Sequence, residues 1–168
     1  FPITLASATP NDGAQQVQIP YDRSTLQARI KIKPTDNYFF DINNANFTIV
    51  FAAAPSATPG TPVLAAASDT GLSNSDALTR LNNADPSRVL SFSVPGTVAG
   101  ATVALYANGT LVGSTVASGT TTIVTTNGSA SIADGLVNFT ARQTESGRPQ
   151  SADSAVAPVT IDSVAPTA

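Results

Sequence analysis

The chain of 168 residues contains no histidine, cysteine, methionine or tryptophan. Without histidine and cysteine there is no Ser-His or Cys-His pair for nucleophilic catalysis and no histidine- or cysteine-bound zinc. Glu145 is the only glutamate, and the aspartates are scattered mostly over turns, so no facing pair of carboxylates of the glycosidase kind is indicated. A Ser-Lys catalyst would need Lys31 or Lys33, which alternate outward on an exposed strand pattern. The sequence therefore predicts a protein that is not an enzyme.

Charge is also scarce, since charged residues make up 11% of the chain, and the net charge is −3. The eight basic residues are scattered apart from Arg29, Lys31 and Lys33. Nucleic-acid binding requires clustered lysine and arginine, so no nucleic-acid partner is expected. No apolar run is long enough to cross a membrane, which argues against membrane insertion. The first residue is not methionine and no signal peptide is visible, so we expect a fragment or a processed piece.

Alternation of apolar and polar residues recurs along the chain, whereas no stretch keeps a convincing helical period. Half-buried antiparallel strands, with one face on a core and the other in water, produce this pattern. The neutral Thr-, Ser-, Ala- and Val-rich composition without cysteine is typical of extracellular bacterial surface proteins. An all-β fold is predicted, with these side chains pointing inward: Leu90, Phe92, Val94, Val103, Leu105, Val137, Phe139 and Ala141.

Turn residues divide the pattern into elements. Asn108-Gly109 and Asn127-Gly128 each lie between apolar runs, which predicts two hairpin turns. Residues 54–62 are rich in proline and carry no large apolar side chain, so they are predicted to be a semi-extended linker. The following segment, 63–162, has the length of a complete immunoglobulin-like sandwich, about 100 residues.

The segment after the linker resembles the tandem immunoglobulin-like repeats of bacterial surface adhesins and large secreted proteins. The resemblance rests on four stretches in order: "PVLAAASDTGLSNSD", "GATVALYANGTLVGS", "ADGLVNFTARQTE" and "VTIDSVAPTA". It departs from the family pattern in loops at 146–149 and 85–86. The resemblance implies an immunoglobulin-like domain over 63–162, closed by a strand at 155–161, with 163–168 as the start of a linker to a next repeat.

The front segment, 1–53, is similar to the last part of a β-sandwich module that follows secreted reprolysin-like metallopeptidase domains. "TPNDG", "ARIKI" and "YFFDINNANFTI" carry this likeness. Four strands are expected, at 3–8, 16–19, 26–33 and 46–51, and they form only part of a sandwich. Their inward apolar residues, such as Ile30, Ile32, Phe47 and Ile49, would need a facing sheet. Missing strands would come from an upstream segment or from another copy of the chain, because an open sheet edge invites strand pairing.

One acidic constellation predicts a metal site. Asp69 and Asp76 lie early in the back domain, and Asp162 stands at its exit. Oxygen ligands in loops are what calcium takes, and the family resemblance supports calcium bound by these three residues. The alternative is that they cap turns. A weaker acidic cluster spans 36–37 and 41–44. No other cofactor is expected.

The leading hypothesis is a structural spacer in an extracellular array or filament that supports adhesion. The alternative is an adhesin module that binds carbohydrate or protein, and a more distant one is an accessory domain of a secreted protease. A binding module should gather exposed aromatic side chains on one loop face. Tyr21, Tyr38 and Tyr106 could stack on a sugar, but single tyrosines on strands usually serve packing.

Overall fold

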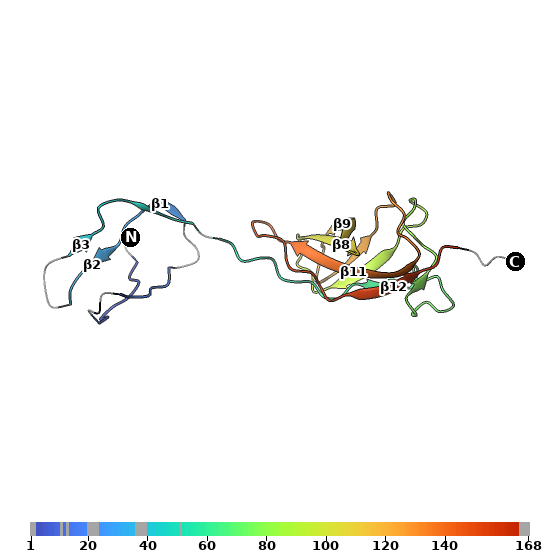
Figure 1. Cartoon of the computed structure of the whole chain (residues 1–168), viewed down its shortest axis with the longest axis horizontal. Coiled ribbons are helices and arrows are strands. Elements are labelled where there is room, and N and C mark those ends of the chain that lie inside the picture. The colour runs from blue at the N-terminus through green and yellow to red at the C-terminus, as the bar shows by residue number, and fades with distance from the viewer. Residues whose placement is uncertain are drawn as a thin grey trace. The chain divides into compact units, whose positions relative to one another are not determined.

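The computed structural model describes residues 3–10, 12, 14–19, 24–35, 40–50 and 52–164. It divides into two compact units, Phe1–Ala52 (unit 1) and Ala53–Ala168 (unit 2), which are treated separately below. All regular structure among the described residues is β-strand, and no helix occurs there (Figure 1). The predicted all-β fold is therefore confirmed.

Unit 1 forms two small antiparallel pairs among its described residues. Strand β1 (Thr25–Ala28) pairs with β4 (Phe47–Ile49), and β2 (Lys31–Ile32) pairs with β3 (Asp41–Ile42). Alternation alone does not make a strand, because backbone N–H and C=O groups also need a partner strand. The strands predicted at 3–8 and 16–19 are absent, and the one predicted at 26–33 is divided between β1 and β2. Residue 51, the end of the fourth predicted strand, lies outside the described residues.

Unit 1 buries little apolar surface. Ala28 is its only buried side chain among the described residues, and Leu26 and Val50 are 77% and 78% exposed. Arg29 donates to the Asn46 side chain at 2.7 Å and to the Asn43 carbonyl at 3.2 Å, so a polar network holds part of the fold. The remaining exposed large apolar residues of this unit are Ile3, Val17, Ile19, Ile30, Ile32, Phe40 and Ile42.

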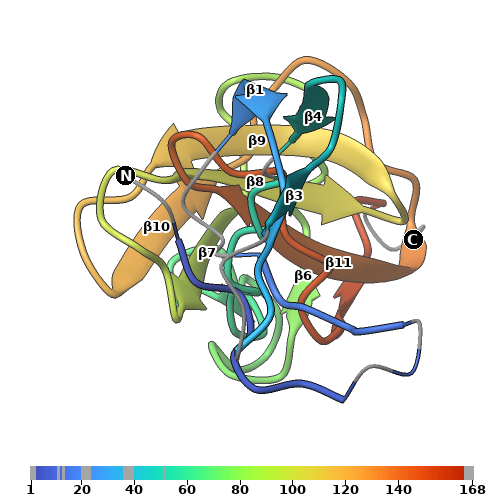
Figure 2. The same ribbon diagram turned by 90° about the vertical axis from the view of Figure 1, so that its left-hand side faces the viewer.

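Unit 2 is a sandwich of two sheets (Figure 2). The three-stranded sheet has the order β10-β7-β5, with β5 (Val63–Leu64), β7 (Ser91–Pro95) and β10 (Thr121–Thr125). The five-stranded sheet has the order β6-β12-β11-β8-β9. Its strands are β6 (Leu78–Thr79), β8 (Thr102–Ala107), β9 (Thr110–Val116), β11 (Gly135–Thr144) and β12 (Ala157–Ile161). Pairing is antiparallel except between β6 and β12.

The core of unit 2 lies between the two sheets and follows the predicted alternation. All eight side chains expected inside are buried, and the rings of Phe92 and Phe139 meet across the sandwich with centroids 4.5 Å apart. Each fully buried valine, leucine or phenylalanine side chain contributes about 1.5–3 kcal/mol to the stability of the fold, because its apolar surface is removed from water. The core therefore stabilises unit 2 independently of unit 1.

The two Asn-Gly turns differ in role. Asn108 and Gly109 have φ values of 47° and 82°, as a tight hairpin turn requires, and they join β8 to β9 as predicted. Asn127-Gly128 was predicted to make a second hairpin, and this prediction is wrong. Strands β10 and β11 belong to different sheets, so this turn lies in a connection that crosses the sandwich. The same dipeptide serves both purposes, with positive φ at both residues in the hairpin but only at Gly128 (62°) in the crossing connection.

The segment predicted as a linker, 54–62, is fixed to unit 2 for much of its length. Ser56 donates to the Pro149 carbonyl from both its N–H (2.9 Å) and its hydroxyl (2.8 Å). Further along, the Gly60 N–H donates to the Pro95 carbonyl at 2.8 Å. Proline-rich composition indicates an extended backbone but does not reveal whether that backbone is docked. Here it is docked on the domain.

The chain enters and leaves unit 2 at opposite ends of the sandwich (Figure 1). It enters beside the C-terminal end of β11, where Ser56 contacts Pro149 and Glu145. It leaves where Ile161 of β12 pairs with Gly135, the first residue of β11. The loops beside this exit are called the exit pole below. Since β11 has ten residues, the two ends lie roughly 30 Å apart at about 3.4 Å per residue.

Candidate functional site at the exit pole

The parallel pairing of β6 with β12 brings the predicted acidic residues to one end of the domain. Thr79 pairs with Ile161, and the Asp162 N–H donates to the Thr79 carbonyl at 2.8 Å. The loop that carries Asp69 and Asp76 leads directly into β6. Asp69, Asp76 and Asp162 therefore all belong to the exit pole, although they are widely separated in sequence.

Asp69 is the most unusual of the three. It is 6% exposed, and its Oδ2 accepts the Ala77 N–H at 3.0 Å. Its Oδ1 is buried without a hydrogen-bond partner among the described residues. A buried carboxylate oxygen without a partner loses its hydration without compensation. Asp69 is thus a candidate ligand for a cation.

The other two aspartates lie in different surroundings. Asp76 Oδ1 accepts the Leu78 N–H at 3.1 Å and Oδ2 accepts the Ser73 N–H at 3.3 Å, as a turn-capping carboxylate does. Asp162 is exposed. Within the described part of the chain, no three carboxylate, histidine or cysteine side chains gather closely enough to form a metal cluster.

The negative charge of unit 2 is concentrated at this pole. Away from it, the four charged residues form the ion pairs Arg142–Asp153 (2.7 Å) and Arg148–Glu145 (3.8 Å). The remaining charged residues therefore carry the whole excess of three negative charges. They are Asp69, Asp76, Arg80, Asp85, Arg88, Asp134 and Asp162. A hydrogen bond from the Ser87 hydroxyl, together with its N–H, lowers the pKa of Asp85.

Other sequence candidates do not join this site. Tyr21, Tyr38, Asp36 and Asn37 lie outside the described residues. Tyr106 is on β8, where the guanidinium of Arg142 covers its ring at 4.8 Å from the centroid. Arg142 also pairs with Asp153, which lowers the pKa of that carboxyl group chiefly through the hydrogen bond. Asn43, from the weaker acidic cluster, accepts the Ile30 N–H and donates to the Ala45 carbonyl.

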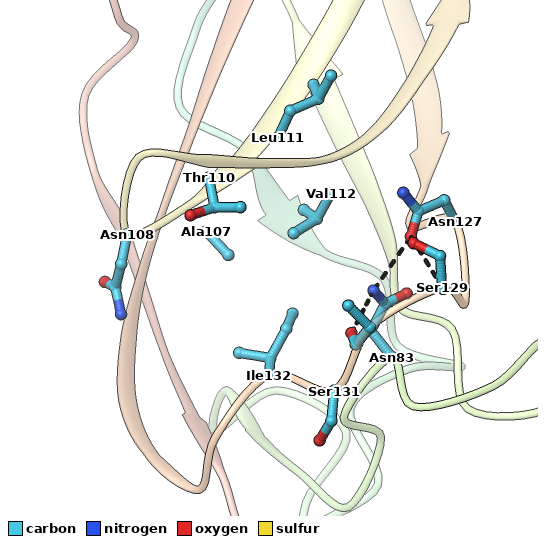
Figure 3. Close-up of a pocket in the computed structure, with 11 residues that line it drawn as sticks. Asn83, Ala107, Asn108, Thr110, Leu111, Val112, Asn127, Ser129, Ser131 and Ile132 are labelled. Atoms are coloured by element: carbon cyan, nitrogen blue, oxygen red, sulfur yellow. Dashed lines mark hydrogen bonds between the residues drawn. The ribbon is translucent and has the colours of Figure 1, made fainter.

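The exit pole also contains a cavity that the sequence reading did not identify (Figure 3). Its volume is about 250 Å³, and it opens between the β8–β9 turn, the start of β9 and the β10–β11 connection. Its lining residues are Asn83, Ala107, Asn108, Thr110, Leu111, Val112, Asn127, Ser129, Ala130, Ser131 and Ile132. The two Asn-Gly dipeptides were the only sequence signal for this cavity. That both lie at the same pole follows from the sheet topology, which the sequence does not specify.

Comparison with known families identifies unit 2. The family model described as "Bacterial Ig-like domain" matches residues 56–163, and the chain belongs to this family. The match begins at Ser56, the residue where the docked segment starts to bond to the sandwich. No curated protein matches the chain significantly. Domains of this family are structural modules, typically non-catalytic and often part of surface or extracellular proteins. A search of the described residues for a helix able to span a membrane finds none.

Proposed function

We propose that the chain is a non-catalytic spacer in a tandem array of an extracellular or cell-surface bacterial protein that supports adhesion. The observation that carries this proposal is the roughly 30 Å between entry and exit, set by the rise of the ten residues of β11. The entry is fixed by hydrogen bonds of Ser56, and the exit continues directly from the paired strand β12. A domain held at both ends in this way keeps the preceding and the following part of the chain at opposite ends of the sandwich.

The alternative function, an adhesin module that binds through exposed aromatic side chains, receives less support. Among the described residues of unit 2 the aromatic side chains are Phe92, Tyr106 and Phe139. The two phenylalanines are buried in the core, and Arg142 covers the tyrosine ring. The likeness of unit 1 to a module that follows secreted metallopeptidases leaves an accessory role in such a protein as the more distant alternative.

We also propose that calcium binds at the exit pole and stiffens the junction with a following domain. Asp69 fits this role because its buried Oδ1 lacks a partner, and Asp162 would supply a second carboxylate at the exit. Asp76 shapes the loop, since both its oxygens accept backbone N–H groups. Calcium takes 6–8 oxygen ligands, so carbonyls, hydroxyls and water would complete the site.

A chain carrying two successive copies of residues 53–164 tests both proposals. We expect small-angle X-ray scattering to show an extended pair of domains. We also expect millimolar calcium to raise the melting temperature relative to chelator, because an ion that binds only the folded form stabilises it, by about 2.7 kcal/mol at 100 times its Kd. Asp69→Asn and Asp162→Ala should remove the calcium effect, whereas Asp153→Asn, in an ion pair outside the exit pole, should retain it.

The two parts of this experiment can fail separately. Equal melting temperatures with calcium and chelator would leave the exit-pole aspartates as turn residues. Free bending at the junction under both conditions would contradict the spacer function itself.

We propose further that unit 1 is completed by additional strands, supplied by an upstream segment of the same polypeptide or by another copy of the chain. Its exposed apolar side chains and its short strand pairs support this. Residues 1–52 alone should show no cooperative thermal transition as a monomer by circular dichroism and analytical ultracentrifugation. A monomer of these residues that melts cooperatively would contradict the proposal.

A further inference from the structure

The cavity at the exit pole has features of a ligand site that the spacer function does not require. All eleven lining residues are uncharged, and they combine side-chain amides and hydroxyls with aliphatic groups. We propose that this cavity binds one neutral, hydroxyl-rich ring, which by its chemistry is a single sugar residue. The cavity combines rigid walls, unpaired hydrogen-bonding groups and an apolar surface in a space of suitable size.

Asn83 fixes one wall of the cavity. It is 1% exposed and has a φ of 58°, an unusual conformation for a residue other than glycine. Its side-chain Nδ2 donates to the Ala130 carbonyl at 2.9 Å and to Asn127 Oδ1 at 3.3 Å, while its Oδ1 accepts the Gly128 N–H at 2.7 Å. Strained backbone supported by such contacts is concentrated at functional sites. The 127–130 segment is therefore held in place before any ligand arrives.

The opposite wall is fixed in the same manner. The Asn108 N–H donates to the Asn138 carbonyl, and Asn108 Oδ1 accepts the Asn138 N–H, both at 2.9 Å. The two walls are joined by the Asn127 N–H, which donates to the Val112 carbonyl at 2.7 Å. A site that is already rigid loses less conformational entropy when it binds.

Several hydrogen-bonding groups on these walls remain free for a ligand. The side-chain NH₂ groups of Asn108 and Asn127 and the hydroxyls of Thr110 and Ser131 make no hydrogen bond with the described residues. Together they offer donors as well as acceptors, because hydroxyls do both. A ligand with several hydroxyl groups can use all of them.

The remaining surface is apolar. Val112 and Ile132 present aliphatic groups between the polar walls, whereas Leu111 points away from Val112 on the other side of the strand (Figure 3). Ile132 is only partly buried, so a ligand that covers it removes apolar area from water. The C–H groups on the faces of a sugar ring meet this requirement, while the hydroxyls at its edge reach the amides.

Charge and size exclude other ligand classes. The lining contains no carboxylate for a metal ion and no cation for an anion, and Asp85 and Asp134 elsewhere at this pole disfavour anions further. The volume of about 250 Å³ lies below the range of about 300–1,000 Å³ for sites of drug-sized ligands. This volume favours a ligand of the size of a single ring over a longer peptide segment.

The test is a titration of the ¹⁵N-labelled chain with glucose, galactose, mannose and N-acetylglucosamine, followed by amide chemical shifts. We expect at least one sugar to produce saturable shifts at residues 107–112 and 127–132, with a Kd on the order of 1 mM, since no aromatic side chain lines the cavity. Failure of all four sugars to saturate below 50 mM, a concentration about 50 times that Kd, or shifts centred elsewhere, would overturn the proposal.

Two variants identify the cavity as the place of binding. Asn127→Asp preserves the oxygen that accepts from Asn83 and Ser129 but removes the free NH₂ group, so binding should weaken at least tenfold. Ser131→Phe, at an exposed position on the rim, should block entry. Asn74→Asp adds the same charge at an exposed position outside the lining and should leave the affinity unchanged. Unaltered binding by Asn127→Asp and Ser131→Phe, with native amide spectra, would also overturn the proposal.

The sugar could be free or could terminate a surface polysaccharide. Methyl glycosides of the sugar that binds distinguish these sources. Retained affinity for one anomer indicates a chain-terminal residue, and affinity lost for both anomers indicates a free reducing sugar.

Discussion

Gly113→Ala is expected to destabilise unit 2 by about 3 kcal/mol, the upper end of the usual cost of overpacking. A Cβ atom at this position would lie 2.3 Å from the carbonyl oxygen of Thr125 and 3.0 Å from the Cα atom of Thr126. These are backbone atoms, so no side chain can rotate to make room. Strand β9 of the five-stranded sheet would have to move away from β10 of the other sheet.

The measurement is urea unfolding of the wild type and the variant, followed by far-UV circular dichroism. Gly119→Ala is the matched control, because nothing lies within 4 Å of the Cβ that it would add. It should stay within about 1 kcal/mol of the wild type, and reduced freedom of the unfolded chain favours slight stabilisation. Equal stabilities of the two variants would show that the sheets do not approach at Gly113.

Alternation along the sequence was sufficient to place the core of unit 2. Side chains such as Phe92 and Phe139 are large, apolar and spaced by two from other apolar residues, so burial on one sheet face is the only arrangement that removes them from water. Nothing local specifies which sheet a strand joins. The hairpin predicted at Asn127-Gly128 failed for this reason, since the turn residues permit either a hairpin or a crossing connection.

The exit pole illustrates a second limit. A run of Asp, Asn and Ser residues predicts turns, and Asp76 caps one, but the same composition does not distinguish it from the buried Asp69. That difference arises from the pairing of Thr79 with Ile161, which are far apart in sequence. The cavity depends in the same way on Asn83 reaching the 127–130 segment. Polar contacts between distant segments leave no periodic pattern in the sequence.

In unit 1 the sequence indicated apolar side chains without an obvious facing sheet. The described structure leaves side chains such as Leu26, Ile32 and Val50 exposed. Alternation predicts which side chains form an apolar face. It does not predict that no sheet packs on this face in the described part of the chain. The strands expected at 3–8 and 16–19 are absent because these segments have no partner strand among the described residues.

Gln143→Leu is expected to destabilise unit 2 by about 2–4 kcal/mol. Each lost hydrogen bond leaves a buried backbone group without a partner, which costs about 1 kcal/mol or more. Gln143 is fully buried and continues the inward-facing series of Val137, Phe139 and Ala141 on β11. Its Nε2 donates to the Ala57 carbonyl at 2.7 Å and to the Gly96 carbonyl at 3.3 Å. Its Oε1 accepts the Val98 N–H at 3.0 Å. Leucine fills the space but satisfies none of these groups.

The loss should be greatest where the chain enters the domain, because Gln143 joins the docked segment around Ala57 to the 96–98 loop. Hydrogen exchange should accelerate at the N–H groups of Ser56, Gly60 and Val98. Gln150→Leu is the control, since Gln150 is exposed and its hydrogen bonds, at 3.4 Å, are long. A surface change of this kind usually stays within about 0.5 kcal/mol.

Gln143→Glu separates the hydrogen bonds from the packing. The carboxylate keeps the shape of the side chain but would face the Ala57 and Gly96 carbonyls as a buried charge, so its folded pKa should rise above the unfolded value of about 4.3. A group with a raised folded pKa contributes most below its unfolded pKa and loses that contribution as pH rises through the folded value. This variant should therefore approach wild-type stability near pH 4 and fall below it at pH 7. A difference between the two proteins that does not change with pH, or exchange at Ser56 and Gly60 equal to the wild type, would show that Gln143 does not hold the entry segment.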